Sequence, residues 1–178
     1  MSTTGAAAAI GWLQIASRLH ALTFNGPLEA GVRAVAILGA AFPRAFDLQR
    51  LTALDYLLVR TRQLGGPEDL HPTTPIQAPA TEVRRKVVHN ALLLMMTRDL
   101  IVREVYPGGL RYKAGESASP FLNSIRTPYL CALKERAFWL VDYLAPYSDT
   151  EFDTLMRRFF DNWIVEFQEV ERSLGGDE

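Results

Sequence analysis

A change of hydrophobic period near residue 100 constrains the fold most. Up to that point apolar residues recur every three to four positions, whereas the stretch VREVYPGGLRYKAG (102–115) alternates with period two around a turn at 107–109. Alternating runs joined by a turn rich in Pro and Gly predict a β-hairpin. The alternation predicts that Arg111 and Lys113 project outward. The residues predicted to face the core are Ile101, Val105, Leu110 and Tyr112.

Two helices are predicted in the segment that precedes the hairpin. One covers about residues 27–41, with Asn25 as the candidate cap and Pro27 in its first turn. Asp47 is placed to cap the other, over 48–62. Their apolar stripes are Leu28, Val32, Val35 and Ile37 or Leu38 in the first helix, and Leu48, Leu51, Leu54, Leu58 and Val59 in the second.

A third helix is predicted over about 81–99, after a long loop at 65–80 that contains two glycines and four prolines. A loop of this length in a compact domain is usually functional or mobile. The residues expected to face inward from the third helix are Val83, Val87, Ala91, Leu94 and Met95. A polar cluster on its other side consists of Arg85, Lys86, His89 and Asn90.

Helices are also predicted after the hairpin, at 116–124, 128–144 and 149–171. The last begins with a capping box formed by Ser148 and Glu151. Its broad apolar stripe fits either a helix packed on two sides within the chain or an interface with a partner protein, where aromatic residues are enriched. The residues predicted to form such an interface are Phe152, Phe160, Trp163, Ile164 and Phe167.

This order of elements predicts a mainly α fold that contains a winged helix-turn-helix domain, although the first short strand of that fold is not evident. We expect a helical N-terminal extension (1–23), a winged-helix-like domain (24–115) with three helices and the hairpin as its wing, and a C-terminal helical layer (116–178).

Neither the composition nor the motifs favour catalysis. The chain has 48% hydrophobic and 22% charged residues, which excludes a disordered class. No phosphate-binding loop or nucleophile elbow is present, and the histidines His20, His71 and His89 lie far apart, so we expect no enzyme activity, cofactor or metal. The single Cys131 fits a reducing cytoplasm, and no segment suggests a membrane span.

The charge distribution makes DNA contact a second hypothesis. Residues 1–114 carry 13 basic and 8 acidic residues, whereas residues 115–178 carry 6 and 12. Sequence-independent phosphate contacts are possible, although a solvated helix face explains the same pattern. The residues concerned are Arg84, Arg85, Lys86, Arg103, Arg111 and Lys113.

Six segments, in order, resemble the second type of middle component of bacterial ABC-three-component systems. They are FNGPLEAGVRA, DLQRLTALDYLLV, GGPEDLHP, EVRRKVVHNALLLMMTRDLI, GLRYKAGESASPFL and LKERAFWLVDYL. The resemblance covers about residues 24–170 and leaves out the extension 1–23, where the chain departs from the family pattern.

The resemblance implies a small, non-catalytic accessory subunit that bridges an SMC/Rad50-like ATPase and an effector, often a nuclease, in Lamassu-type defence against phages or plasmids. Its winged helix would then serve assembly. The competing hypothesis is a winged-helix transcription regulator that binds DNA. The resemblance offers no catalytic residues, and it implies structural or interfacial roles for Asp55, Tyr56, Gly66, His71, Arg84, Arg85, Gly109 and Tyr112.

Overall fold

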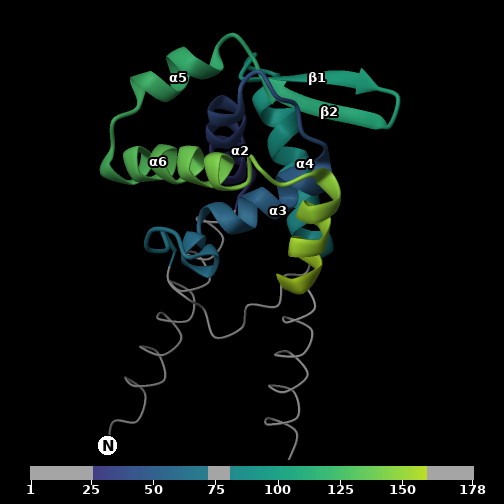
Figure 1. The fold of residues 1–178 in the computed structure, drawn as a ribbon. Coiled ribbons are helices and arrows are strands. Elements are labelled where there is room, and N and C mark those ends of the chain that lie inside the picture. The colour runs from purple at the N-terminus through teal and green to yellow at the C-terminus, as the bar shows by residue number, and fades with distance from the viewer. Residues whose placement is uncertain (1–25, 72–80, 160–178) are drawn as a thin grey trace, which may run out of the picture.

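The computed structural model describes residues 26–71 and 81–159, which are mainly helical, with a two-stranded antiparallel hairpin (Figure 1). The elements, in order, are α2 (Pro27–Ala41), α3 (Leu48–Leu58), the short 3₁₀ helix η1 (Thr61–Leu64), α4 (Thr81–Met96), β1 (Ile101–Tyr106), β2 (Gly109–Ala114), α5 (Ala118–Ser124) and α6 (Pro128–Tyr143), followed by helical residues 149–159. The rest of the last predicted helix, 160–171, lies outside the described residues.

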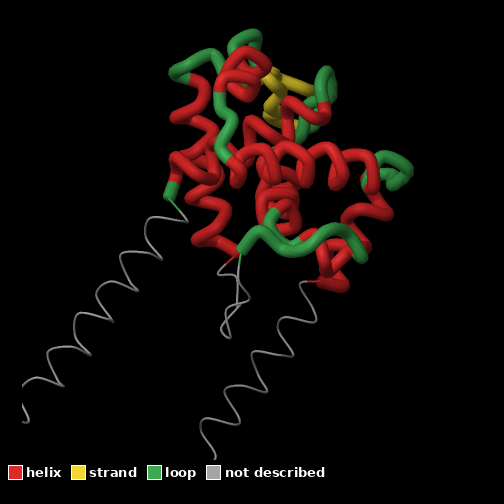
Figure 2. The backbone as a smooth tube through the Cα atoms, turned by 90° about the vertical axis from the view of Figure 1, so that its left-hand side faces the viewer, coloured by secondary structure: helices red, strands yellow, loops and turns green. Residues whose placement is uncertain are grey.

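Helix α2 lies at the centre of the core. Its side chains Val35, Ile37 and Leu38 are fully buried, and it contacts α3, α4, α5, α6 and β2. The helices pack around it, and the two strands gather at one end of this helical body (Figure 2). The predicted span of 27–41 is confirmed, but Leu28, predicted to be part of the apolar stripe, is 64% exposed. The cap position is Gly26, and Asn25 lies outside the described residues.

Helix α3 begins as predicted and ends earlier. The Asp47 carboxylate accepts a hydrogen bond from the backbone N–H of Arg50 at 2.7 Å, which satisfies one of the free donors at the helix start. The helix ends at Leu58 instead of residue 62, and η1 turns the chain. Gly65 then closes the turn with a φ of 76°, in the left-handed region that favours glycine.

The inward face of α4 differs from the predicted one. Val83 is 60% exposed and Leu94 is 40% exposed. Ala91 and Met95 are buried as predicted, and Val88 and Leu92 are buried in place of Val83 and Leu94. The helix is therefore rotated by about one residue from the predicted orientation. It ends at Met96 instead of residue 99, and a turn with Asp99 at a φ of 53° leads into β1.

The hairpin is confirmed, with strand partners running from Ile101–Ala114 to Tyr106–Gly109. Strand β2 has one further antiparallel partner on its other side, Phe46, from the connection between α2 and α3. The N–H of Tyr112 donates to the carbonyl of Phe46 at 2.8 Å, and the reverse bond measures 2.9 Å. The connection, β2 and β1 therefore lie side by side in that order.

The predicted inward face of the hairpin is buried only at its base. Ile101 and Tyr112 are buried, but Val105 is 85% exposed and Leu110 is 44% exposed. The register places Val105 directly opposite Leu110, on the same face as the two buried residues. The face was thus predicted correctly, but the hairpin projects beyond the helices and leaves its outer half uncovered (Figure 1).

Glycine at position 115 is required by a close approach of two backbone segments. A Cβ atom there would lie 2.1 Å from the carbonyl oxygen of Asp99. We expect Gly115→Ala to lower the free energy of unfolding by about 1–3 kcal/mol, because a backbone atom cannot move aside as a side chain can. The control Gly108→Ala, with open space around its Cβ position, is expected to change it by less than about 0.5 kcal/mol. Urea denaturation of both variants measures the difference, and equal midpoints would contradict this packing.

Candidate functional site

Two polar regions are built around arginine residues, one fully buried and one half-buried. The first centres on Asp55 of α3, whose carboxylate lies 2.6 Å from Nε of Arg33 on α2 and 2.7 Å from Nη1 of Arg84 on α4. Arg33 and Asp55 are almost fully buried. Burial disfavours the charged form of Arg33, but the Asp55 carboxylate opposes this effect and the pKa of the guanidinium is raised. The shared carboxylate connects three helices of the core.

Further groups surround this cluster. The guanidinium of Arg60 lies 4.5 Å from the ring centre of Tyr56, and that of Arg84 lies 5.4 Å from it. Nε2 of His71 lies 3.0 Å from the hydroxyl oxygen of Tyr129. Four positions that the family resemblance singled out thus come together here, namely Asp55, Tyr56, His71 and Arg84. Their contacts give them a structural role.

The other positions for which the family resemblance implies a role either allow close packing or turns, or lie on the surface. A Cβ atom at Gly66 would lie 2.4 Å from the ring of Trp139, so this glycine allows α6 to approach. Gly109 has a φ of 126° at the end of the hairpin turn, and Tyr112 is buried at its base. Arg85 is exposed on α4.

Acid is expected to destabilise the protein through His71. Burial, together with the charges of Arg33 and Arg60, lowers the pKa of His71 from 6.5 to about 4. Because the unfolded chain then binds the proton more strongly, this contribution to stability is present above pH 6.5 and is lost as the pH falls from 6.5 toward 4. For this half-buried ring we expect a loss of about 1–2 kcal/mol.

The test compares unfolding free energies between these two pH values. His71→Gln, which cannot gain this proton, should lose less stability than the natural protein over the interval. His89→Gln is the matched control because His89 is exposed on α4. An identical pH dependence in the His71 variant and the natural protein would contradict the burial of this ring.

The second region is a cleft beside the hairpin, with a volume of about 390 Å³. It forms where the α2–α3 connection, the start of α3, the hairpin and the start of helix 149–159 meet. We call it the hairpin cleft, and its lining residues are Arg44, Ala45, Phe46, Asp47, Gln49, Arg50, Tyr106, Arg111, Tyr147, Asp149, Phe152 and Asp153.

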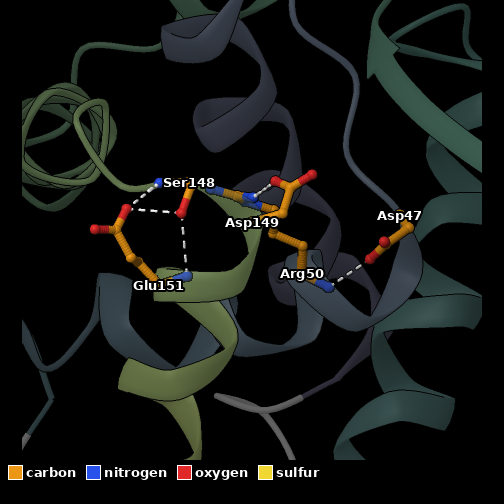
Figure 3. A network of polar contacts seen from close by, with 5 residues as sticks. All are labelled: Asp47, Arg50, Ser148, Asp149 and Glu151. Carbon is orange, nitrogen blue, oxygen red and sulfur yellow. Dashed lines mark hydrogen bonds and ion pairs between the residues drawn. The ribbon is translucent and has the colours of Figure 1, made fainter.

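Arg50 joins α3 to the start of helix 149–159 (Figure 3). Its Nη1 atom lies 2.6 Å from Oδ1 of Asp149, and its guanidinium lies 4.2 Å from the ring centre of Phe152 and 5.2 Å from that of Phe46. Within the part of the chain that the structure describes, the buried Nε of Arg50 has no hydrogen-bond partner. The guanidinium is therefore held in place with one donor unused.

The predicted capping box is confirmed beside Arg50. The Ser148 hydroxyl donates to Oε2 of Glu151 at 2.7 Å and accepts from the Glu151 backbone N–H at 3.3 Å (Figure 3). The Ser148 backbone N–H also donates to this carboxylate, and these hydrogen bonds lower the pKa of Glu151. The box determines where helix 149–159 begins and so positions Asp149 against Arg50.

The hairpin contributes an aromatic and a cationic side chain to the cleft. The Arg111 guanidinium lies 5.1 Å from the ring centre of Tyr106. The Tyr106 hydroxyl donates to Glu104 at 2.9 Å, and Glu104 also pairs with Lys113. The Lys113 ammonium is the main cause of the lowered pKa of Glu104. Glu104 thus connects Tyr106 of its own strand with Lys113 of the other strand.

The structure does not gather the predicted DNA-contacting residues on one surface. Arg84 points inward to Asp55, while Arg85 and Lys86 are exposed on α4. The strand register separates the remaining residues, because Arg103 lies on the opposite face of the hairpin from Arg111 and Lys113. Four of the six therefore remain as exposed basic groups without an ion pair among the described residues, namely Arg85, Lys86, Arg103 and Arg111.

Of the five residues predicted to form the partner interface, the structure describes only Phe152. Phe152 is 3% exposed and packs within the core of this chain, below Arg50. Phe160, Trp163, Ile164 and Phe167 lie outside the described residues. Sequence reasoning missed Arg44 and Tyr106 as cleft residues, because no local pattern relates the α2–α3 connection to the hairpin tip.

The comparisons with known proteins give one result. Residues 23–166 match the family described as ABC-three component (ABC-3C) system Middle Component 2. The chain belongs to this family. The match includes both polar regions and the hairpin, and membership implies an accessory role within a multi-component system. No curated protein and no solved structure matches the chain.

Among residues 26–71 and 81–159, no group of His, Cys, Asp and Glu side chains is arranged to hold a metal ion. No helix in these two segments has both the length and the apolar character needed to cross a membrane.

Proposed function

We propose that this chain is a non-catalytic adaptor that bridges an SMC/Rad50-like ATPase and an effector nuclease in a Lamassu-like system acting against phages or plasmids. Membership of the Middle Component 2 family supports an accessory role. The observation that carries the adaptor proposal is the exposed apolar pair of Val105 and Leu110 on the projecting hairpin.

This pair is suited to protein contact. It lies on the hairpin face that is buried at its base by Ile101 and Tyr112, next to the exposed Arg103. On the opposite face, Glu104 and Lys113 are already paired with each other. A partner that covers the pair removes apolar surface from water without breaking those contacts, and such exposed patches commonly mark interfaces.

A winged helix is the fold that we propose for residues 24–115. The order α2, α3, α4, β1, β2 supports it, and so does the bridge between Phe46 and Tyr112. In a winged helix the first short strand lies between the first two helices and pairs with the hairpin, and Phe46 occupies that position. In this proposal the hairpin is a wing used for protein contact, and DNA contact through Arg85 and Lys86 is secondary.

An adaptor needs a second surface. We propose that the predicted helix 149–171 supplies it through Phe160, Trp163, Ile164 and Phe167. The alternative function, a DNA-binding transcription regulator, would require two-fold dimers with base-reading side chains on α4. In the described part of α4 the exposed polar side chains are chiefly basic, with Asn90 as the side chain best suited to base reading, so the adaptor is favoured.

The direct test is co-expression with the protein products of the neighbouring genes. We expect a tagged form of this chain to retain both an ATPase and an effector through size-exclusion chromatography. Retention of neither protein, together with tight and sequence-specific binding to DNA by the chain alone, would support the regulator instead.

A further inference from the structure

We propose that the hairpin cleft binds an acidic peptide segment of a partner protein, with an aspartate or glutamate side chain next to an aromatic or aliphatic one. This inference rests on the proposed adaptor function, because it assigns a second type of contact to the same subunit. The cleft is distinct from the apolar pair of Val105 and Leu110, which is not part of its lining.

The cationic groups of the cleft are oriented before any partner arrives. Arg44 lies 5.9 Å from the ring centre of Phe46, and Arg111 lies 5.1 Å from that of Tyr106. Neither has a carboxylate partner among the described residues. Arg50 also lines the cleft, and its buried Nε has no hydrogen-bond acceptor among the described residues. Guanidinium groups held in this way suit a carboxylate, which can accept two parallel hydrogen bonds.

The acidic residues of the lining argue for a peptide instead of nucleic acid. Asp47 caps α3 and Asp149 pairs with Arg50, while Asp153 has no ion-pair partner in the described segments. A run of phosphates would bring several negative charges close to these three carboxylates. A peptide can present one carboxylate to the arginines and neutral groups elsewhere, so mixed charge favours a peptide.

The size and the walls of the cleft limit what enters. Its volume of about 390 Å³ is near the lower end of the range for ligand pockets, so it accommodates a few side chains and not a whole helix. The rings of Phe46, Tyr106 and Tyr147 provide apolar walls. An apolar side chain beside the carboxylate would pack against these rings while the carboxylate contacts Arg44 or Arg111.

The test uses two synthetic peptides of equal length, one alternating Asp with Phe and the other alternating Lys with Phe, titrated into the full chain by calorimetry. We expect the acidic peptide to bind and the lysine peptide not to bind. Arg44→Gln combined with Arg111→Gln should weaken acidic-peptide binding at least tenfold. Arg85→Gln combined with Lys86→Gln, on exposed basic residues of α4, is the matched control and should bind the peptide normally.

Circular dichroism should show both double variants folded, because none of the four arginine or lysine residues has an ion pair within the described structure. Absence of acidic-peptide binding, equal binding of the two peptides, or an equal loss in the control variant would overturn the proposal. Displacement of the acidic peptide by a DNA duplex through Arg44 and Arg111 would also overturn it, in favour of a nucleic-acid site. Co-purification of the natural protein with the ATPase and the effector tests the adaptor function separately: if it persists while the acidic peptide does not bind, the cleft proposal fails and the adaptor function stands.

Discussion

Asp55→Asn is expected to lower the free energy of unfolding by about 3–5 kcal/mol, a large fraction of the roughly 5–15 kcal/mol that stabilises a typical domain. The carboxylate of Asp55 is shared by Arg33 and Arg84, and Arg33 is only 3% exposed. Without the negative charge, the Arg33 guanidinium stays buried and uncompensated. Removing one member of a buried ion pair therefore costs far more than the pair itself contributes.

Urea denaturation followed by circular dichroism measures this effect. Asp142→Asn is the matched control, because Asp142 is exposed on α6 and has no ion pair within the described residues. The double variant Arg33→Met with Asp55→Leu should recover much of the loss, since it removes both buried charges together. A loss below about 1 kcal/mol in Asp55→Asn would mean that Arg33 is compensated by other groups.

Val105→Asp combined with Leu110→Asp is expected to weaken partner binding about a hundredfold or more and to abolish co-purification. A carboxylate buried in an interface without a partner costs several kcal/mol, and each 1.4 kcal/mol is a factor of ten in affinity. The free protein should change in stability by less than about 1 kcal/mol, because Val105 is 85% exposed and Leu110 is 44% exposed.

The matched control for the hairpin is Val83→Asp, which places the same charge at a 60% exposed valine on α4. We expect this variant to retain its partners, because Val83 lies on a different element. If the hairpin variant assembles as the natural protein does, the hairpin is not the docking surface. The C-terminal residues Phe160 and Ile164 then become the next positions to change.

Features determined by a few neighbouring residues were predictable from the sequence. The Asp47 cap and the Ser148–Glu151 box each depend on side chains three residues from the N–H groups that they bind. The hairpin follows from alternation on both sides of a turn rich in Pro and Gly. Such local signals predicted most element positions, with differences of a few residues at the ends.

Features that depend on distant contacts were not predictable. The face that α4 buries is linked to the ion pair between Arg84 and Asp55, which lie 29 residues apart. Helical periodicity alone allows either of two adjacent stripes on this helix. The hairpin cleft depends on Arg50 meeting Asp149, 99 residues later in the chain. No pattern in either segment predicts that contact.

The most direct test of the adaptor account asks whether this chain joins two proteins that do not otherwise associate. In this test the proposed ATPase partner carries an affinity tag, and the proposed effector is co-expressed with or without this chain. We predict that the tagged ATPase retains the effector only when this chain is present, and that the Val105/Leu110 aspartate variant fails to support retention. Equal retention of the effector in the absence of this chain would contradict the account.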